Sequence, residues 1–438
     1  MNSSTISATA GVPVSAAVRR RAVVAASIGN VLEIYDFIAF GIFAVPIART
    51  FFPAGSEFAA LIMTFMTFAA GFLARPLGAL LLGRYADRVG RKRALSLTLV
   101  LMAVGTLVPA VCPSYAAIGV AAPLIIVLGR LVQGFSAGGE VGGAVAMMVE
   151  NAGGKRRGLY GSFQQMSQGG GVLVAGLIGV LMTNTFTEQQ ILAGGWRLAF
   201  VFGVLIGPVG WYIRRAIPET PEFSAPAAKR EDEPLLQGLA RHSGQILMGI
   251  GLMVFWTIGT YVSNYFTTYA VRELHLSLQQ SYLGQIAYGV TMLVACPVFG
   301  ALSDRIGPLK PMAYGAGLSA LLAYPLFWVL AEHPSLPMLM AVQSVIAVLL
   351  ASYAACAARV LADVFPVHFR ATGVGISYAL GVTIFGGLTP LAVTSLIHWT
   401  GDKLIVGLYL SGAAIVSAVL LTLFRPAPAA QTAAKASA

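Results

Sequence analysis

The stretch that decides the fold reads Gly83-Arg84-Tyr85-Ala86-Asp87-Arg88-Val89-Gly90-Arg91-Lys92-Arg93, a basic segment between two apolar runs. A weaker copy follows 217 residues later (300 minus 83) as Gly300-Ala301-Leu302-Ser303-Asp304-Arg305-Ile306-Gly307, with Pro308 and Leu309 in place of the basic pair. The offset is close to half of the 438-residue chain. The sequence therefore predicts two halves built on one plan, and parallel repeats of this kind are known from membrane proteins.

The composition around this repeat is that of a membrane protein. Hydrophobic residues make up 57% of the chain and charged residues only 10%, with a mean hydropathy of +0.79, whereas soluble proteins carry about 25% charged residues. The net charge of +11 does not predict nucleic-acid binding, because the basic residues lie in short clusters between apolar runs. The three cysteines lie singly within apolar stretches, so we expect no disulfide, no metal site and no cofactor.

Twelve apolar runs are long enough to cross a bilayer, which takes about 20 residues. We therefore predict an all-α membrane protein whose twelve transmembrane helices form two pseudo-symmetric six-helix bundles. The first run follows Arg19-Arg20-Arg21 and is too long for a signal peptide. The predicted spans are 22–48, 58–82, 94–112, 118–149, 159–182, 196–216, 244–270, 281–303, 311–331, 336–362, 372–397 and 404–424.

The distribution of Lys and Arg between alternate loops predicts the orientation. With a cytoplasmic N-terminus, 21 of these residues face the cytoplasm and only four face the other side, namely Arg49, Arg197, Arg272 and Lys403. Both termini are then cytoplasmic. The expected parts are a disordered N-terminus at 1–21, an N-terminal bundle at 22–216, a cytoplasmic linker at 217–243, a C-terminal bundle at 244–424 and a disordered tail at 425–438.

Several motifs resemble a known family. The segment 83–93 resembles the cytoplasmic signature of the major facilitator superfamily, and Gly129-Arg-Leu-Val-Gln-Gly-Phe-Ser-Ala-Gly-Gly-Glu140 is similar to the fourth-helix pattern of its metabolite:proton symporters. Residues 29–37, 51–61 and 386–403 resemble bacterial citrate–proton and tricarballylate transporters. The resemblance implies a multi-pass protein of the bacterial inner membrane that imports citrate or a similar tricarboxylate by proton symport. Related branches carry dicarboxylates such as 2-oxoglutarate, other organic acids, betaine or proline.

Acidic residues within the spans are candidates for proton coupling, because each costs about 2.5–3.5 kcal/mol to insert. Glu33 and Asp36 lie three residues apart and share one face of the first helix. By resemblance to sugar porters of the superfamily, Asp36 matches an aspartate that pairs with a fourth-helix arginine, here Arg130. A neighbouring cation favours the carboxylate, and loss of that contact favours the protonated acid. Glu140 is a further candidate; a permanent structural ion pair is the alternative for each.

Arginines within the spans are candidates for binding an anion. Arg75 lies twelve residues before Asp87, hence about 18 Å from the loop and near the middle of the membrane. Its guanidinium is suited to bidentate contact with a carboxylate, and Pro76 is expected to kink the helix. Arg130 can contact substrate, pair with Asp36, or do both. Packing or a permanent ion pair is the alternative for all substrate-binding candidates, which are Arg75, Arg130, Asn30, Gln133, Gln165, Gln168, Tyr261 and Asn264.

The repeated loop has the features of a conformational gate. An Asp–Arg network beside the positive end of a helix can hold one conformation and release in another. Simple anchoring by positive charge is the alternative. The gating candidates are Gly83, Asp87, Arg88, Gly90 and Arg91, with Asp304 and Arg305 in the second copy. Arg359 and Asp363, four residues apart, are expected to form a pair at the membrane interface.

Other classes of protein fit less well. A membrane enzyme needs a nucleophile with its base, metal ligands or a nucleotide loop, and no such motif occurs. A channel is disfavoured by the buried charges, and a non-transporting sensor by the lack of a signalling appendage. The expected partners are a small organic anion, protons and the lipid bilayer, without nucleic acid, and the protein is expected to function as a monomer.

Overall fold

The structure is a computed structural model that describes residues 30–31, 34–53, 55–89, 91–138, 156–204, 235–366 and 369–423, with side chains at all of these except 83–84, 86–89, 91–96, 235–236 and 371. The regular secondary structure of these residues is entirely helical. Beside helical segments at Ile34–Ile42 and 197–204, the elements are α2 (Ala44–Phe51), α3 (Glu57–Leu73), α4 (Arg75–Val89), α5 (Arg91–Val111), α6 (Tyr115–Ile118), α7 (Ala121–Gly138), α9 (Arg157–Thr185), α10 (Glu188–Gln190), η1 (Ile191–Gly195), α12 (Leu235–Arg241), α13 (Ser243–Arg272), α14 (Leu278–Ile306), α15 (Leu309–Glu332), α16 (Leu336–Val364), α17 (Arg370–Gly381), η3 (Val382–Gly387), α18 (Thr389–Thr400) and α19 (Ile405–Leu423).

The helices have the lengths and surfaces of a membrane protein. Among the described residues, nine helices are long and apolar enough to cross a bilayer, or ten if a bent pair counts as one span. Large apolar side chains point outward, such as Leu321 with 72% and Trp399 with 77% of its surface exposed. Such a surface suits hydrocarbon rather than water. The all-α membrane architecture is therefore confirmed.

The first predicted span is bent, which the hydropathy pattern did not indicate. Ile34–Ile42 and α2 meet at an angle of 69°. Pro46 stands four residues after Ile42 and has no N–H to donate to the Ile42 carbonyl. A proline ring also clashes with the carbonyl four residues before it. Pro46 therefore explains why the helix breaks at Phe43.

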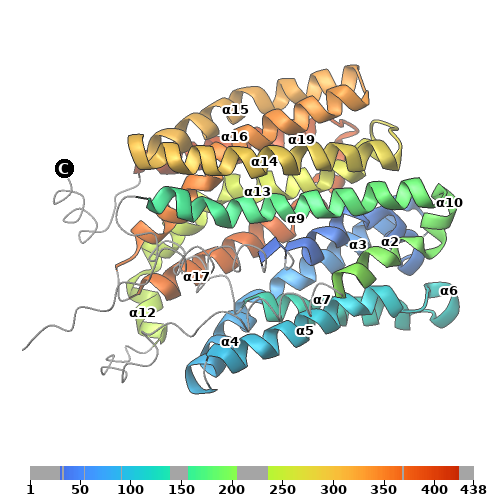
Figure 1. Cartoon of the computed structure of the whole chain (residues 1–438), viewed down its shortest axis with the longest axis horizontal. Coiled ribbons are helices and arrows are strands. Elements are labelled where there is room, and N and C mark those ends of the chain that lie inside the picture. Colours follow the sequence, from blue (N-terminus) through green and yellow to red (C-terminus); the bar gives the residue numbers. More distant parts are fainter. Residues whose placement is uncertain are drawn as a thin grey trace, which may run out of the picture.

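The two halves of the chain meet along α9 and α14, which lie side by side through the middle of the molecule (Figure 1). Glycines make this close approach possible: a Cβ on Gly169 would overlap Met292, and a Cβ on Gly289 would come within 2.7 Å of Leu173. The helices from α3 to α7 lie on one side of this seam, and α15, α16 and α19 lie on the other (Figure 1).

The halves are also in contact at both ends of the bundle. At one end the ring of Phe58 stacks on that of His398 with 3.7 Å between centroids, and Gln279 donates a hydrogen bond to Asn184 at 2.7 Å. At the other end the start of α9 is bonded to the end of α14. Contacts between the halves therefore occur at both ends of α9 and α14.

Candidate functional site

Charged side chains gather at the centre of the molecule. Of the described residues, only Asp36, Arg75 and Arg130 are buried and charged, with 7%, 4% and 1% of their surfaces exposed. The guanidinium carbons of Arg75 and Arg130 lie 4.2 and 5.2 Å from the centroid of the Phe37 ring. The three predicted residues are therefore all buried in the interior, where both guanidinium groups lie against the ring of Phe37, the residue that follows Asp36. With Asp36 ionised, the described residues of this centre comprise two cations and one anion, an excess of one positive charge.

The glycines of the motif at 129–140 explain how Arg130 reaches this centre. A Cβ on Gly134 would overlap the Gly71 carbonyl of α3, and a Cβ on Gly138 would overlap the Arg75 carbonyl of α4. On another face of α7, a Cβ on Gly105 of α5 would lie 2.7 Å from the Cβ of Gln133. These glycines thus let the backbone of α7 approach α3, α4 and α5 closely, as small residues do at other membrane helix interfaces.

Arg75 is held by aromatic rings and not by a counter-ion. Its guanidinium carbon lies 4.2 Å from the Phe37 centroid and 4.3 Å from the Phe72 centroid. Its Nε is buried without a hydrogen-bond partner, and no hydrogen bond or ion pair joins Arg75 to another described residue. A buried guanidinium with unused donors is costly. An anionic ligand would supply the missing acceptors.

Pro76 affects the same region through the backbone. Because Pro76 has no N–H, the Phe72 carbonyl lacks its usual helical donor. Thr383 of η3 donates its hydroxyl to that carbonyl at 2.8 Å. The proline therefore opens a backbone acceptor at the centre, and the second half of the chain occupies it.

Asp36 and Arg130 do not form the expected ion pair; no contact within 4 Å joins them in the structure. Two other side chains stand between them. Arg130 donates to Oε1 of Gln133, Nε2 of Gln133 donates to Oγ1 of Thr106 at 3.3 Å, and Thr106 donates to Oδ2 of Asp36 at 2.7 Å. Spacing within single helices carries no information on which residue of α5 enters this gap, and pairing of Asp36 with Arg130 in another state of the protein stays a prediction.

The second half of the chain contributes one face of α13. The ring of Tyr261 packs on Phe68 and Phe72 at centroid distances of 6.0 and 5.3 Å. Both polar atoms of the Asn264 amide are buried without partners. The hydroxyls of Thr257 and Thr268 are also unpartnered, and the spacing 257, 261, 264, 268 places all four on one helix face. This spacing can be seen in the sequence. Thr257 and Thr268 become candidates only because the structure shows their hydroxyls buried without a partner.

The other amides singled out from the sequence bond within the protein. Asn30 donates to Ser167 at 2.5 Å, so it joins the first helix to α9. Gln165 accepts from Trp256 Nε1 at 2.7 Å, and Gln168 donates to the Tyr378 hydroxyl at 3.4 Å. These last two bonds connect the halves of the chain. A substrate-binding role for these residues stays a prediction.

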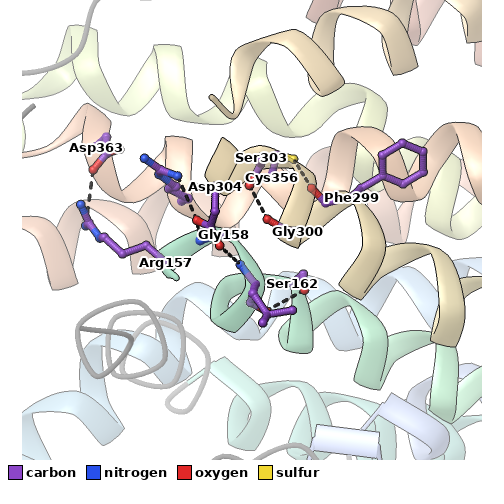
Figure 2. A network of polar contacts seen from close by, with 11 residues as sticks. Arg157, Gly158, Ser162, Phe299, Gly300, Ser303, Asp304, Cys356 and Asp363 are labelled. Carbon is purple, nitrogen blue, oxygen red and sulfur yellow. Dashed lines mark hydrogen bonds and ion pairs between the residues drawn. The ribbon is translucent and has the colours of Figure 1, made fainter. Parts of the chain in front are cut away.

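The second copy of the repeated loop forms a polar network at one end of the seam (Figure 2). The Asp304 carboxylate accepts from the backbone N–H groups of Gly158 at 2.7 Å and Leu159 at 3.0 Å. These N–H groups open α9 and have no partner within the helix, and an anion at a helix N-terminus is favourable. Asp304 therefore connects the two halves.

Two ion pairs correct the expected contact between Arg359 and Asp363, and Figure 2 shows that of Asp363 with Arg157. Arg359 lies 3.4 Å from Asp304, whereas Asp363 lies 3.6 Å from Arg157. Each residue therefore binds a partner on another helix, because the end of α16 packs beside α14 and α9. The Arg305 side chain is exposed.

The Asp304 contact predicts a change in the accessibility of a native cysteine. In Asp304→Asn the helix-capping charge is lost, which should open this end of the seam. Cys356 is buried within the network, with Sγ 3.9 Å from the Phe299 carbonyl. The rate of alkylation of Cys356 by N-ethylmaleimide is measured in a background carrying Cys112→Ala and Cys296→Ala. Asp304→Asn should make it about tenfold faster than in the same background with Asp304 intact, because the lost hydrogen bonds to a charged group each contribute about 1.5–3 kcal/mol to the closed form. Lys310→Gln, on the exposed start of α15, is the control; an unchanged rate in Asp304→Asn would contradict the gate.

Some sequence-based candidates lie outside the described residues. These are Glu33, Glu140 and Gly90, together with Gly83 and the side chains of Asp87, Arg88 and Arg91. Their proposed roles stay predictions. Within the described ranges no cluster of His, Cys, Asp and Glu could hold a metal ion.

Comparison with known proteins identifies the class of protein that this fold and centre define. The family model described as Major Facilitator Superfamily matches residues 26–330 and 248–438. A crystal structure of a D-xylose-proton symporter matches with a TM-score of 0.74 and 19% identity, over 93% of this chain and 98% of that one. The chain belongs to the Major Facilitator Superfamily. It is thus a multi-pass membrane transporter and not an enzyme.

Among curated relatives, the chain is similar to the citrate-proton symporter of Klebsiella pneumoniae, with 39% identity over 409 residues, 92% of each protein. It is also similar to the alpha-ketoglutarate permease of Escherichia coli K12, with 36% identity over 86% of this chain and 88% of that protein. The proline/betaine transporter of Salmonella typhimurium is 33% identical over 91% of this chain and 82% of that protein.

Proposed function

We propose that this protein imports an organic acid by proton symport, with citrate or a similar tricarboxylate as the leading substrate. The observation that carries the proposal is the buried centre with its excess positive charge, where Arg75 has no counter-ion among the described residues. A carboxylate can accept two parallel hydrogen bonds from a guanidinium. The unpaired amide of Asn264 and the hydroxyl of Thr257 suit the remaining carboxyl and hydroxyl groups.

Proton coupling follows from the charge of such a substrate. Moving one negative charge into a cell with an inside-negative potential costs about 2.3 kcal/mol per 100 mV. Protons carried together with a tricarboxylate would offset this cost. Asp36 is the proposed carrier, because it is the one acidic side chain buried among the described residues.

The relatives support an acid in preference to a zwitterion only in part, since their printed substrates include citrate, alpha-ketoglutarate, and proline or betaine. The centre itself favours the acid. Quaternary ammonium groups are recognised by aromatic faces, but Phe37, Phe40, Phe68 and Phe72 already contact the two guanidinium groups. A dicarboxylate such as 2-oxoglutarate remains the second candidate.

The proposed architecture has twelve transmembrane helices in bundles at 22–216 and 244–424, with cytoplasmic termini, in the bacterial inner membrane. The Asp304 network would then close the cytoplasmic end, and the stack of Phe58 on His398 the outer end. Alternate opening of these contacts would expose the centre to each side, and a monomer suffices for this cycle.

Uptake into proteoliposomes tests the proposal. Labelled citrate should accumulate under an inside-alkaline pH gradient and leak out when a protonophore collapses that gradient. Unlabelled 2-oxoglutarate and glycine betaine, added as competitors, rank the substrate classes. Competition by betaine but not by carboxylates would overturn the acid assignment. Absence of uptake for several organic acids would favour a sensor that does not transport.

A further inference from the structure

Thr106 is a residue of the buried centre that the sequence did not single out. It lies on α5 with 2% of its surface exposed. Its Oγ1 is within hydrogen-bond distance of Asp36 Oδ2 at 2.7 Å, of the Met102 carbonyl at 3.0 Å, and of Gln133 Nε2 at 3.3 Å. One hydroxyl therefore meets a carboxylate, a carbonyl and an amide.

The chemistry of these groups determines the direction of each hydrogen bond. A guanidinium can only donate, so Gln133 must present Oε1 to Arg130 and its NH₂ group to Thr106. Thr106 accepts that bond, and its single proton remains free to be donated. When Asp36 is ionised, the carboxylate is the stronger acceptor for this proton, because hydrogen bonds to charged groups are the stronger ones.

Thr106 can also accept a hydrogen bond from the protonated form of Asp36, in a weaker bond between neutral groups. The Oδ1 atom of Asp36 has no partner and lies against the Cα of Gly203, where an added Cβ would be 2.5 Å away. A proton on Oδ1 would thus lack an acceptor, so the acid places its O–H on Oδ2. Thr106 Oγ1 accepts from it with a second lone pair and turns its own proton to the Met102 carbonyl.

We propose that Thr106 is a positioning residue that switches its hydroxyl between Asp36 and Met102, so that Asp36 gains and loses its proton while its Oδ2 atom and the Thr106 hydroxyl both keep a hydrogen-bond partner. The inference rests on the proposed role of Asp36 in proton coupling. The other ionisable groups that the structure describes around Asp36 do not replace this function. Arg130 is held by Gln133, Tyr35 donates to the Ala199 carbonyl at 2.7 Å, and Arg75 stacks on phenylalanine rings.

Infrared spectroscopy on the reconstituted full-length protein tests the inference without a substrate. The carbonyl band that disappears in Asp36→Asn reports the protonated acid and is followed across pH. In Thr106→Val, which keeps the shape but removes the donor, the ionised form is destabilised. The pH at which half of the band is lost should move upward by about one pH unit, since a hydrogen bond to a charged group exceeds one between neutral groups by about 1–1.5 kcal/mol.

Two variants serve as controls. Thr106→Ser retains the hydroxyl and should keep the wild-type midpoint. Thr64→Val removes a buried hydroxyl that donates only to the Ala60 carbonyl, and it should also leave the midpoint unchanged. The inference is overturned if Thr106→Val titrates like the wild type, or if Thr106→Ser shifts as far as Thr106→Val.

The same variants in the uptake assay distinguish this inference from the proposed function. With Thr106→Val, uptake should be lost at an external pH about one unit higher than in the wild type, because Asp36 keeps its proton up to a higher pH. If the wild type transports no carboxylate but the infrared shift occurs, the proposed function fails and the inference stands. If transport occurs without any shift, the inference fails alone.

Discussion

Asp36→Asn is expected to abolish proton-driven accumulation of substrate and to preserve substrate exchange across the membrane. Asparagine has nearly the same shape, and its side-chain oxygen still accepts from Thr106, which donates to Asp36 at 2.7 Å. The neutral side chain, however, no longer takes up and releases a proton. Uptake under a pH gradient should fall to the level reached by equilibration, whereas counterflow of labelled against unlabelled substrate should continue.

Glu57→Gln is the matched control for this experiment. Glu57 is an exposed carboxylate that pairs with Arg49 at 2.9 Å at the start of α3. Its neutralisation should leave accumulation intact. If Asp36→Asn accumulates substrate as the wild type does, Asp36 is not the proton carrier. If both accumulation and exchange disappear, Asp36 is needed for substrate binding or folding instead.

Arg75→Lys is expected to weaken substrate binding by about 10- to 150-fold, which corresponds to the 1.5–3 kcal/mol of a hydrogen bond to a charged group. Lysine keeps the positive charge but offers no planar fork for a carboxylate. It also loses part of the contact with the rings of Phe37 and Phe72, which lie 4.2 and 4.3 Å from the guanidinium carbon. Equilibrium binding of labelled citrate to purified protein measures the effect.

Arg49→Lys, at an exposed ion pair, should bind substrate with wild-type affinity. A normal affinity in Arg75→Lys would remove Arg75 from the site. The size of the loss also tests the charge argument: because the excess positive charge at the centre persists in Arg75→Lys, a large loss shows that fork geometry, beyond charge, recognises the substrate.

Several features were predictable because they depend on local properties of the chain. Apolar runs of bilayer length predicted the spans, and nine described helices match this criterion. The high cost of inserting a charge singled out Asp36, Arg75 and Arg130, and all three are buried. The motifs also predicted the family, which the family model and the relatives confirmed.

The partners of these residues were less accessible to prediction. Arg130 was expected to bind Asp36, yet Gln133 and Thr106 occupy the gap. Likewise, Arg359 binds Asp304 and not Asp363. Thr106 and the two threonines of α13 could not be singled out either. Nothing in the sequence around them separates them from threonines such as Thr64, whose hydroxyl bonds a carbonyl of its own helix.

Hydropathy and charge act within single helices, so the residues alone were enough to predict the class of protein, the approximate spans and the side chains too costly to be placed in lipid. Which groups meet depends instead on how the helices pack against one another. Contacts between glycines and the backbones of other helices, such as that of Gly134 with Gly71, set how closely the helices approach. A hydrogen bond forms or fails over less than 1 Å, so the pairing of Thr106 with Asp36 depends on packing between residues that are 70 positions apart in the chain.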